Sequence, residues 1–505
     1  MTLIKGGTVF DGTSEPGKKN DILIDGEVIA AIGQDLPGDG CQTFDATGLN
    51  ICPGFIDIHG HSELEILRDP LMKAKVNQGI TTEVSGNCGI GVFPIRDVRT
   101  MPKGLLTEIL GPWEDFSWND YSSYRSFLFE KNSPYSLLML QSHSMLRFSA
   151  MEGNPNRPAS DSEILAMVRM LEKSMDQGCL GLSTGLYYAP CIYASDKELQ
   201  MLAETVARND GILAVHHRCE GTDIRSSLKQ IITIAEKAKV RLEISHLKII
   251  GMKNQGLLDE VFSIIENAET EIGFDQYPYD FGSTSLNSLL PPDILSLDEA
   301  AQKQALKNPS TRKKVVSKMK NPLGWDSITD LAGMDNIRIS YLAHFPQYLG
   351  MSLEEIAKAH DKDPYDSLLD ILSEETGPAM MIDVTETRET LKRIFLHPLG
   401  CFGTDALYTA SNGHPRSYGA APHVLSKSFL DEMGTTTEFA INRMTGKTAT
   451  RLRLNDRGFI RKGLRADIVI YNPSVICDTA TMTKAASNPI GIKAVFIAGC
   501  NQELG

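Results

Sequence analysis

The chain has 505 residues, of which 42% are hydrophobic and 23% are charged, and its formal net charge is −14. This composition is that of a globular protein, and the negative charge argues against binding nucleic acid or an anionic membrane through bulk electrostatics. No stretch has the pattern of a signal peptide or a membrane span, and nine scattered cysteines do not read as a disulfide framework. A cytoplasmic location is expected. The sequence makes no prediction about oligomeric state.

Both ends of the chain have a similar sequence pattern. Residues 1–52 contain short β-branched runs separated by glycine-rich turns, and the same pattern returns in residues 447–505. Because chain termini are often close in space, the two segments are expected to form one small β-sandwich domain.

Between the two ends, apolar runs that resemble strands alternate with segments of helical periodicity. The runs lie at 53–58, 80–85, 136–141, 179–184, 211–216, 241–246, 271–277 and 399–404. This alternation predicts an α/β fold, a (β/α)8 TIM-like barrel over residues 53–446. The gap before the last run is too long for a simple loop, and residues 286–350 within it are expected to form an inserted helical subdomain near the barrel mouth.

The first of these strands ends in PGFIDIHGHSE, residues 53–63. In an extended strand, side chains two residues apart point the same way, so His59 and His61 are placed to share one metal ion. Asp57 is on the same face, where a carboxylate can orient a ligand histidine or touch the metal itself. Two unrelated surface histidines at a strand end are the alternative for this motif alone.

Residues typical of metal sites follow the other strands as well. They are Cys88 in a glycine-flanked turn, His143, the pair His216 and His217, His246 with Lys248, and Asp405. The carboxyl ends of barrel strands meet at one face, so this concentration predicts a metal centre. Nitrogen and sulfur ligands with one carboxylate suit zinc better than magnesium or calcium. For Cys88, a buried thiol in a tight turn and a catalytic nucleophile are the alternatives.

Several longer motifs resemble the amidohydrolase superfamily and, within it, the N-acyl-D-amino-acid deacylases (D-aminoacylases). They are PGFIDIHGH, GNCGI, LGLSTGLYYAP, SHLK, DQYPY and MTGKTATRLRLNDRGFIRKGLRADIVIYNP. They span nearly the whole chain in the family's order. The resemblance implies a distorted (β/α)8 barrel with a small β-sandwich and a helical insertion, as the sequence pattern predicts.

The resemblance also implies a set of zinc ligands. Cys88, His216 and His246 would form a tight zinc site. His59 and His61 would contribute to a second, weaker metal position, which Cys88 can bridge. Many relatives instead bridge two metals with a carbamylated lysine on the fourth strand, but that strand, CLGLSTG, has no lysine. This favours the cysteine-bridged branch over dihydroorotases and hydantoinases. His217 is extra relative to the family pattern and is expected to face the other side of its strand.

The activity implied by the resemblance is zinc-dependent hydrolysis of the amide of N-acyl-D-amino acids, with Asp405 as general base and then general acid. Lys248, with Tyr279 and Ser285, would hold the substrate α-carboxylate, and Tyr187 and Tyr188 would line the acyl pocket. A solvated lysine and a packing tyrosine are the alternatives for Lys248 and Tyr279. No arginine occurs in DQYPYDFGSTSL, which favours neutral or apolar D-amino acids over acidic ones.

Two other functions compete with this interpretation. The first is an amidohydrolase that acts on cyclic amides or on D- or isoaspartyl dipeptides, and the missing lysine weighs against it. The second is a non-catalytic metal-binding scaffold. A non-catalytic scaffold would not need Asp405 beside the metal-type residues, so it is disfavoured.

Overall fold

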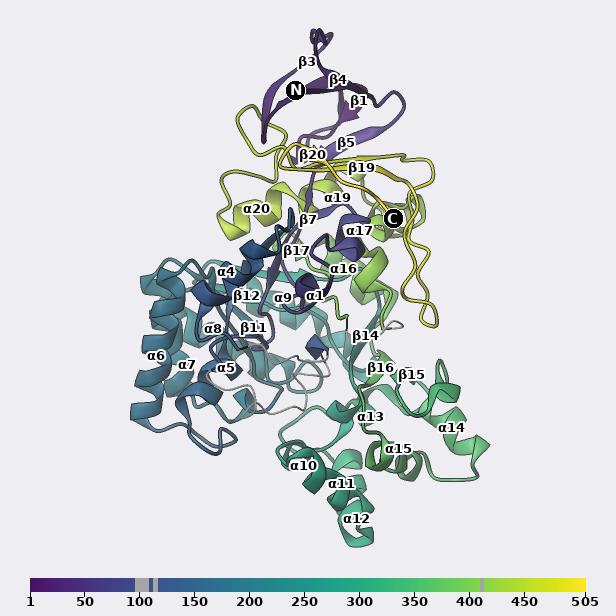
Figure 1. The fold of residues 1–505 in the computed structure, drawn as a ribbon. Coiled ribbons are helices and arrows are strands. Elements are labelled where there is room, and N and C mark those ends of the chain that lie inside the picture. The colour runs from purple at the N-terminus through teal and green to yellow at the C-terminus, as the bar shows by residue number, and fades with distance from the viewer. Residues whose placement is uncertain (96–108, 112–116, 409–412) are drawn as a thin grey trace.

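The computed structural model describes residues 1–95, 109–111, 117–408 and 413–505. Both ends of the chain contribute strands to one sheet, at the top of Figure 1. A group of helices from the middle of the chain lies at the opposite end, and parallel strands with their helices lie between (Figure 1). The protein therefore has an α/β fold.

The sheet at the top joins the two ends of the chain. Its strand order is β20-β19-β18-β5-β1-β2-β3, with β4 paired to β1. The bounds are β1 (Thr2–Val9), β2 (Lys18–Asp25), β3 (Val28–Gly33), β4 (Gln42–Asp45), β5 (Asn50–Pro53), β18 (Ile468–Tyr471), β19 (Ile492–Ile497) and β20 (Cys500–Asn501). The antiparallel pair of β5 with β18 connects the N-terminal and C-terminal strands. Buried Ile4, Ile22, Ile51, Ile468 and Phe496 share one core beneath it.

Among the described residues, the middle of the chain contains nine parallel strands in two sheets, ordered β6-β7-β8 and β9-β10-β11-β12-β13-β17. The bounds are β6 (Phe55–Asp57), β7 (Ile80–Ser85), β8 (Ser136–Met139), β9 (Gln141–Ser142), β10 (Gly181–Gly185), β11 (Ile212–His216), β12 (Arg241–Ile244), β13 (Ile272–Gln276) and β17 (Gly400–Phe402). Two backbone hydrogen bonds link the sheets, from Leu180 to Met139 at 2.8 Å and from Ile58 to Phe402 at 3.2 Å. Each of the eight runs expected to be a parallel strand overlaps a strand of this set.

Amphipathic helices connect the parallel strands. Helix α6 (Asp161–Asp176) begins with a capping box formed by Ser160 and Glu163. Its residues Ile164, Met167 and Leu171 lie on one buried face. The other long helices are α7 (Asp196–Arg208), α8 (Ile224–Ala238) and α9 (Leu258–Glu266). Helices α6 (Asp161–Asp176) to α9 bury these faces in the same core as strands β10 to β13. The remaining helices of this part are α1 (Glu65–Arg68), α2 (Lys73–Val76), α4 (Tyr121–Glu130), α5 (His143–Ala150), α16 (Arg388–Leu396), α17 (Arg416–Leu425), α18 (Lys427–Met433), α19 (Thr437–Met444) and α20 (Gly446–Leu452).

The segment between β13 and β17 has a small antiparallel sheet and helices of its own. The sheet has the order β14-β16-β15, from β14 (Phe281–Ser285), β15 (Ile337–Leu342) and β16 (Ala379–Val384). The helices are α10 (Pro292–Leu295), α11 (Glu299–Lys307), α12 (Pro309–Lys320), α13 (Ile328–Ala332), α14 (Leu353–Ala359) and α15 (Pro364–Glu374). Leu289, Leu306, Ile339, Leu368 and Met381 belong to a separate hydrophobic core. The expected insertion, residues 286–350, lies within this segment.

Two features of the sequence can be compared with the structure directly. All nine cysteines are unpaired. Within the described ranges, every helix is too short or too polar to cross a membrane.

Candidate metal centre and active site

Six of the residues singled out by the sequence meet where the parallel strands end. They are His59 and His61 after β6, Cys88 after β7, His216 at the end of β11, His246 after β12, and Asp405 after β17. They form two adjoining groups, His59–His61–Cys88–Asp405 and Cys88–His216–His246. Within each group, one ligand atom from every residue lies within 4.8 Å of the others. The five residues expected as metal ligands therefore lie together, with Cys88 common to both groups, and Asp405, expected as the catalytic carboxylate, is part of the first group.

Cys88 is held in this position by its backbone. Its φ is +52°, and Gly86, two residues earlier, has a φ of +85°. A Cβ on Gly86 would lie 2.3 Å from the carbonyl oxygen of Leu140, so the turn requires glycine there. The Cys88 Sγ lies 3.3 Å from Nε2 of His59 and 3.4 Å from Nε2 of His246. Burial alone would raise the pKa of the thiol, but positive charge on these two histidines brings it well below its usual value. The thiolate is the form that binds a metal.

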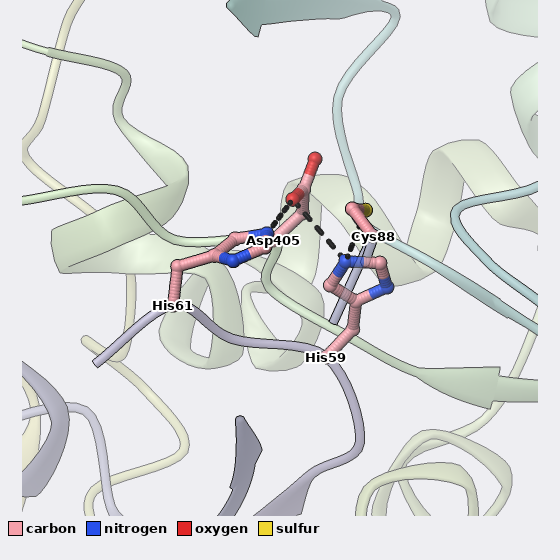
Figure 2. A group of neighbouring side chains, drawn as sticks. All are labelled: His59, His61, Cys88 and Asp405. Atoms are coloured by element: carbon pink, nitrogen blue, oxygen red, sulfur yellow. Dashed lines mark hydrogen bonds and ion pairs between the residues drawn. The ribbon is translucent and has the colours of Figure 1, made fainter. Parts of the chain in front are cut away.

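Within the first group, the Asp405 carboxylate faces the rings of His59 and His61, as Figure 2 shows. Its Oδ1 lies 3.4 Å from Nε2 of His59 and 3.3 Å from Nε2 of His61. Its Oδ2 lies 2.9 Å from Nη1 of Arg416, which is buried. Burial tends to raise the pKa of the Asp405 carboxyl, but Arg416 and His59 hold it well below the usual range. The carboxylate is therefore ionised near neutral pH.

His216 is the ligand candidate whose ring has the fewest polar contacts. Within the described part of the chain, neither ring nitrogen has a hydrogen-bond partner, although the residue is only 4% exposed. The rings of Tyr187 and Tyr188 pack against it, with centroids 5.8 and 5.0 Å away. Burial lowers the pKa of His216 and so favours the neutral imidazole, which is the metal-binding form. A buried, neutral imidazole beside a thiolate suits zinc, and its Nε2 lies 3.9 Å from Oε2 of Glu220.

The carboxylate that orients the histidines is Asp275, at the end of β13, rather than Asp57. Oδ1 of Asp275 lies 3.0 Å from Nδ1 of His59 and also accepts the backbone N–H of His246 at 2.9 Å. Asp57 accepts the backbone N–H of His59 at 3.1 Å, so it positions the main chain and not the ring. Asp57 belongs to neither of the two groups. The sequence did not identify Asp275, because strand alternation says nothing about contacts between distant strands.

Asp57 instead belongs to a charged network beneath the metal-type residues. It forms a buried ion pair with Lys75, which also lies 3.1 Å from Oε2 of Glu83. Asp57 also accepts hydrogen bonds from Thr404, from the backbone N–H at 2.8 Å and from the hydroxyl at 2.6 Å. Lys75, Asp57, Glu83 and Thr404 are 0% exposed. Asp57 lies two residues before His59, and Thr404 directly precedes Asp405. The network therefore fixes the two chain segments that carry these members of the first group.

The residues expected to contact substrate lie in different surroundings. Lys248 is next to the metal-type residues, with Nζ 2.7 Å from Oε1 of Glu220 and 2.9 Å from Nδ1 of His246. Tyr279 directs its hydroxyl away from them, to Oδ2 of Asp478 at 3.2 Å. Tyr277 is the tyrosine of this loop that lies by the site, with its ring centre 4.8 Å from the Arg416 guanidinium. Burial raises the pKa of the Tyr277 hydroxyl, and the positive charge of Lys248 opposes that rise.

Ser285 and Tyr187 have structural partners. The Ser285 side chain is buried and accepts the backbone N–H of Asn287 at 3.1 Å, at the start of η4 (Leu286–Leu289). The Tyr187 hydroxyl donates to the backbone carbonyl of Asp326 at 3.1 Å. Its neighbour Tyr188 is the one that lines the cavity described next.

A small cavity of about 20 Å³ opens beside the two groups. It is lined by His61, Cys88, Ile90, Ile109, Tyr188, His246, Ser283, Thr284, Asp405, Leu407 and Arg416. The cavity thus brings together metal-type residues, the Asp405 carboxylate, one guanidinium and apolar side chains.

The sequence interpretation missed Arg416 and Glu220. Arg416 ends the segment HPR, residues 414–416, and follows Asp405 by eleven residues. This short distance in sequence from a proposed catalytic carboxylate was the available signal. Glu220 stands in HHRCEG just after β11, but nothing in the sequence gives the direction of its side chain. Both residues are buried in the site.

Two other strand-end histidines point elsewhere. His143 is buried between Oγ1 of Thr184 and Oε1 of Glu198, each at 2.8 Å. His217 lies 3.1 Å from Oγ of Ser227, on helix α8, as expected for the opposite side of the strand. Neither belongs to the two groups.

Comparisons with known proteins agree with this arrangement. A model of the amidohydrolase family matches residues 42–287 and 368–499. The D-aminoacylase of Alcaligenes xylosoxydans xylosoxydans is 31% identical over 500 residues, which cover 98% of this chain and 93% of that protein. The N-acyl-D-aspartate deacylase of the same organism is 29% identical over 500 residues, 98% of this chain and 91% of that protein.

A solved structure is similar over the whole length. It is the N-acyl-D-glutamate deacylase from Bordetella bronchiseptica, complexed with zinc and a phosphonate inhibitor that mimics the tetrahedral intermediate. The identity is 28%, the TM-score is 0.84, and the match covers 99% of this chain and 96% of that one. The chain therefore belongs to the amidohydrolase family, in the branch of the N-acyl-D-amino-acid deacylases.

Proposed function

We propose that this protein is a zinc-dependent hydrolase that cleaves the amide bond of N-acyl-D-amino acids, giving a carboxylate and a free D-amino acid. The observation that supports this most strongly is the pair of metal-type groups that share Cys88, with the ionised Asp405 carboxylate facing them. The D configuration is proposed from the named relatives, because the geometry of this site does not by itself select an enantiomer.

Zinc fits the residues that are present. Cys88, His216 and His246 would hold the first ion, and His59 and His61 would hold a second one together with the shared thiolate. When bound, zinc supplies Lewis acidity, which polarises the amide carbonyl and makes water a better nucleophile near neutral pH. We propose one tight site and one weaker site.

Asp405 is the proposed general base and acid. Its carboxylate is ionised in the free protein, so it can take the proton of the attacking water and later give it to the leaving amine nitrogen. Arg416 keeps the carboxylate charged and fixes its Oδ2, which leaves Oδ1 directed at the histidines. The proton is therefore held at a defined oxygen atom.

Two cations can hold the α-carboxylate of the substrate. Nζ of Lys248 lies 2.9 Å from Nδ1 of His246, and Nη1 of Arg416 lies 2.9 Å from Oδ2 of Asp405. The Arg416 guanidinium also lies 4.8 Å from the ring centre of Tyr277. A guanidinium and an ammonium together recognise a carboxylate strongly. We assign the anchoring role to Lys248, Arg416 and Tyr277, and not to Tyr279, whose hydroxyl is bonded to Asp478.

The cavity walls favour a neutral or apolar side chain on the substrate. Ile90, Ile109 and Leu407 form part of the lining. Among the described lining residues Arg416 is the one guanidinium, and with Lys248 it is needed for the α-carboxylate. No cation is left over in that lining for an acidic side chain. We therefore propose neutral or apolar N-acyl-D-amino acids as substrates.

We also propose that the parallel strands close into a (β/α)8 barrel over residues 53–446. The hydrogen bonds that join the edges of the two parallel sheets support closure. Residues 1–52 and 447–505 would form the β-sandwich, and residues 286–350 would belong to the helical insertion near the mouth.

The test combines metal analysis with turnover of N-acetyl amino acids in both enantiomers. We expect one to two zinc ions per chain and acetate release from neutral D-substrates only. Zinc without turnover of any N-acetyl amino acid would refute the proposed reaction, and hydantoins and isoaspartyl dipeptides would then be assayed. A protein that binds no zinc would contradict the metal assignment itself.

A further inference from the structure

One of the contacts between the inserted segment and the site is made by buried Asp326, which lies between α12 and α13. Oδ2 of Asp326 accepts two backbone N–H groups of the loop after β11, from Glu220 at 2.6 Å and from Gly221 at 2.9 Å. Asp326 is 4% exposed. The segment packs closely there, because a Cβ on Gly221 would lie 2.7 Å from Leu331 of α13. The insertion therefore holds this loop by two hydrogen bonds and by close packing.

The residue held in this way, Glu220, contacts the functional groups directly. Its Oε1 lies 2.7 Å from Nζ of Lys248 and 3.1 Å from Nδ1 of His246. Its backbone carbonyl accepts the N–H of Ile250 at 2.8 Å, so the main chain of Glu220 is fixed on both sides. A carboxylate behind a ligand histidine sets the direction of the ring, and such groups strongly influence metal affinity.

We propose that Asp326 is a positioning residue of the active site. It fixes Glu220, and through Glu220 it sets the His246 ring and the Lys248 ammonium. The inserted segment would then control two properties together, zinc affinity through His246 and affinity for the substrate carboxylate through Lys248. The second of these rests on the proposed function, whereas the first does not.

The test compares Asp326→Ala with Asp326→Asn in the full-length protein. Zinc affinity is measured by competition with a chelator, and KM and kcat are measured with N-acetyl-D-leucine. Asp326→Ala should weaken zinc binding by about tenfold. It should also raise KM by more than it lowers kcat, because Lys248 acts in binding. Asp326→Asn should stay near wild type, because its amide oxygen can still accept both N–H groups.

The matched control is Asp330→Ala. Asp330 lies on the same segment and also links it to a loop of the parallel-strand region, through Lys253 at 2.9 Å, but both side chains are exposed to solvent. This variant should keep the zinc affinity and the KM of the wild type. Equal values in Asp326→Ala and Asp330→Ala would overturn the proposal, as would a loss of thermal stability in Asp326→Ala with zinc affinity and KM unchanged.

Two further measurements keep the proposal testable. If Asp326→Ala does not fold, Asp326→Glu retains the charge but displaces the acceptor by one methylene, and it should still weaken zinc binding. In the Glu220→Gln background, Asp326→Ala should add little, because both substitutions act through the same side chain. Full additivity would contradict the proposal. A wild-type protein that binds zinc but hydrolyses no N-acyl-D-amino acid would refute the proposed function, and chelator competition would still test Asp326.

Discussion

Nδ1 of His59 lies 3.0 Å from Oδ1 of Asp275, and the two side chains are 0% and 2% exposed. This contact leaves Nε2 of His59 directed toward the sulfur of Cys88, 3.3 Å away. The same carboxylate oxygen accepts the backbone N–H of His246. Asp275 thus couples one histidine from each metal-type group.

Asp275→Ala should therefore lower zinc affinity by about 10–100-fold, measured by chelator competition. Asp275→Asn is the matched variant, because its amide oxygen can still accept from both partners, and its loss should be smaller. Wild-type zinc affinity in Asp275→Ala would show that the carboxylate does not orient the ligands.

Asp405→Asn should lower kcat by about 10²–10⁴-fold, because the amide cannot take the proton of the attacking water. The zinc held by Cys88, His216 and His246 should be retained, since Asp405 is not in that group. Elemental analysis and steady-state kinetics on the same preparation check both statements. A kcat within tenfold of wild type would remove Asp405 from the role of general base.

Two tyrosines of one loop provide a matched pair. Tyr277→Phe should raise KM for N-acyl-D-amino acids, because it removes the hydroxyl proposed to hold the substrate carboxylate while it keeps the ring that contacts Arg416. Tyr279→Phe should leave KM unchanged and cost roughly 1 kcal/mol of unfolding free energy, through the lost hydrogen bond to Asp478. If Tyr279→Phe were the variant with the raised KM, the anchoring assignment would have to be reversed.

Lys75→Met should be strongly destabilising, by roughly 3–5 kcal/mol, because it leaves buried Asp57 and Glu83 without their cation. Lys73→Met, on the same short helix but exposed, is the control and should change the unfolding free energy little. Urea unfolding measures both. A Lys75→Met protein as stable as the control would mean that the two carboxyl groups are neutral in the folded state.

Glu386 should make stability depend on pH. Burial raises its pKa from 4.5 to about 8. The folded protein therefore keeps a proton that the unfolded chain releases near pH 4.5. The contribution of Glu386 to the free energy of unfolding is complete below that pH and is lost as pH rises through about 8. The slope reaches roughly 1.4 kcal/mol per pH unit. Glu386→Gln should remove it in urea unfolding at pH 5 to 8, whereas exposed Glu389→Gln should behave as wild type.

The sequence predicts the parallel strands and the convergence of the metal-type residues for a clear physical reason. Apolar runs such as 80–85 and 241–246 have strand length, and the carboxyl ends of parallel strands meet at one edge. His59, Cys88, His246 and Asp405 could therefore be placed together from local patterns alone, although they span most of the chain.

The contacts that orient those residues could not be predicted in this way. Strand β13 ends at Gln276, so side-chain alternation no longer applies to Tyr277 and Tyr279, and the sequence selected Tyr279. Contacts such as Asp275 with His59, or Asp326 with Glu220, join residues more than a hundred positions apart. Their geometry depends on how whole segments pack against one another. The hydrophobic periodicity of the sequence carries no information about that packing.

The segment around β14, β15 and β16 has a hydrophobic core separate from that of the parallel strands. A segment with its own core can open as one cooperative unit while the rest of the molecule stays folded. Such an opening would withdraw Asp326 from the loop that carries Glu220, although every ligand candidate lies outside the opened segment. Mild denaturant would then abolish substrate binding before strands β10 to β13 lose their protection from hydrogen exchange, so inactivation and global unfolding would be separate transitions.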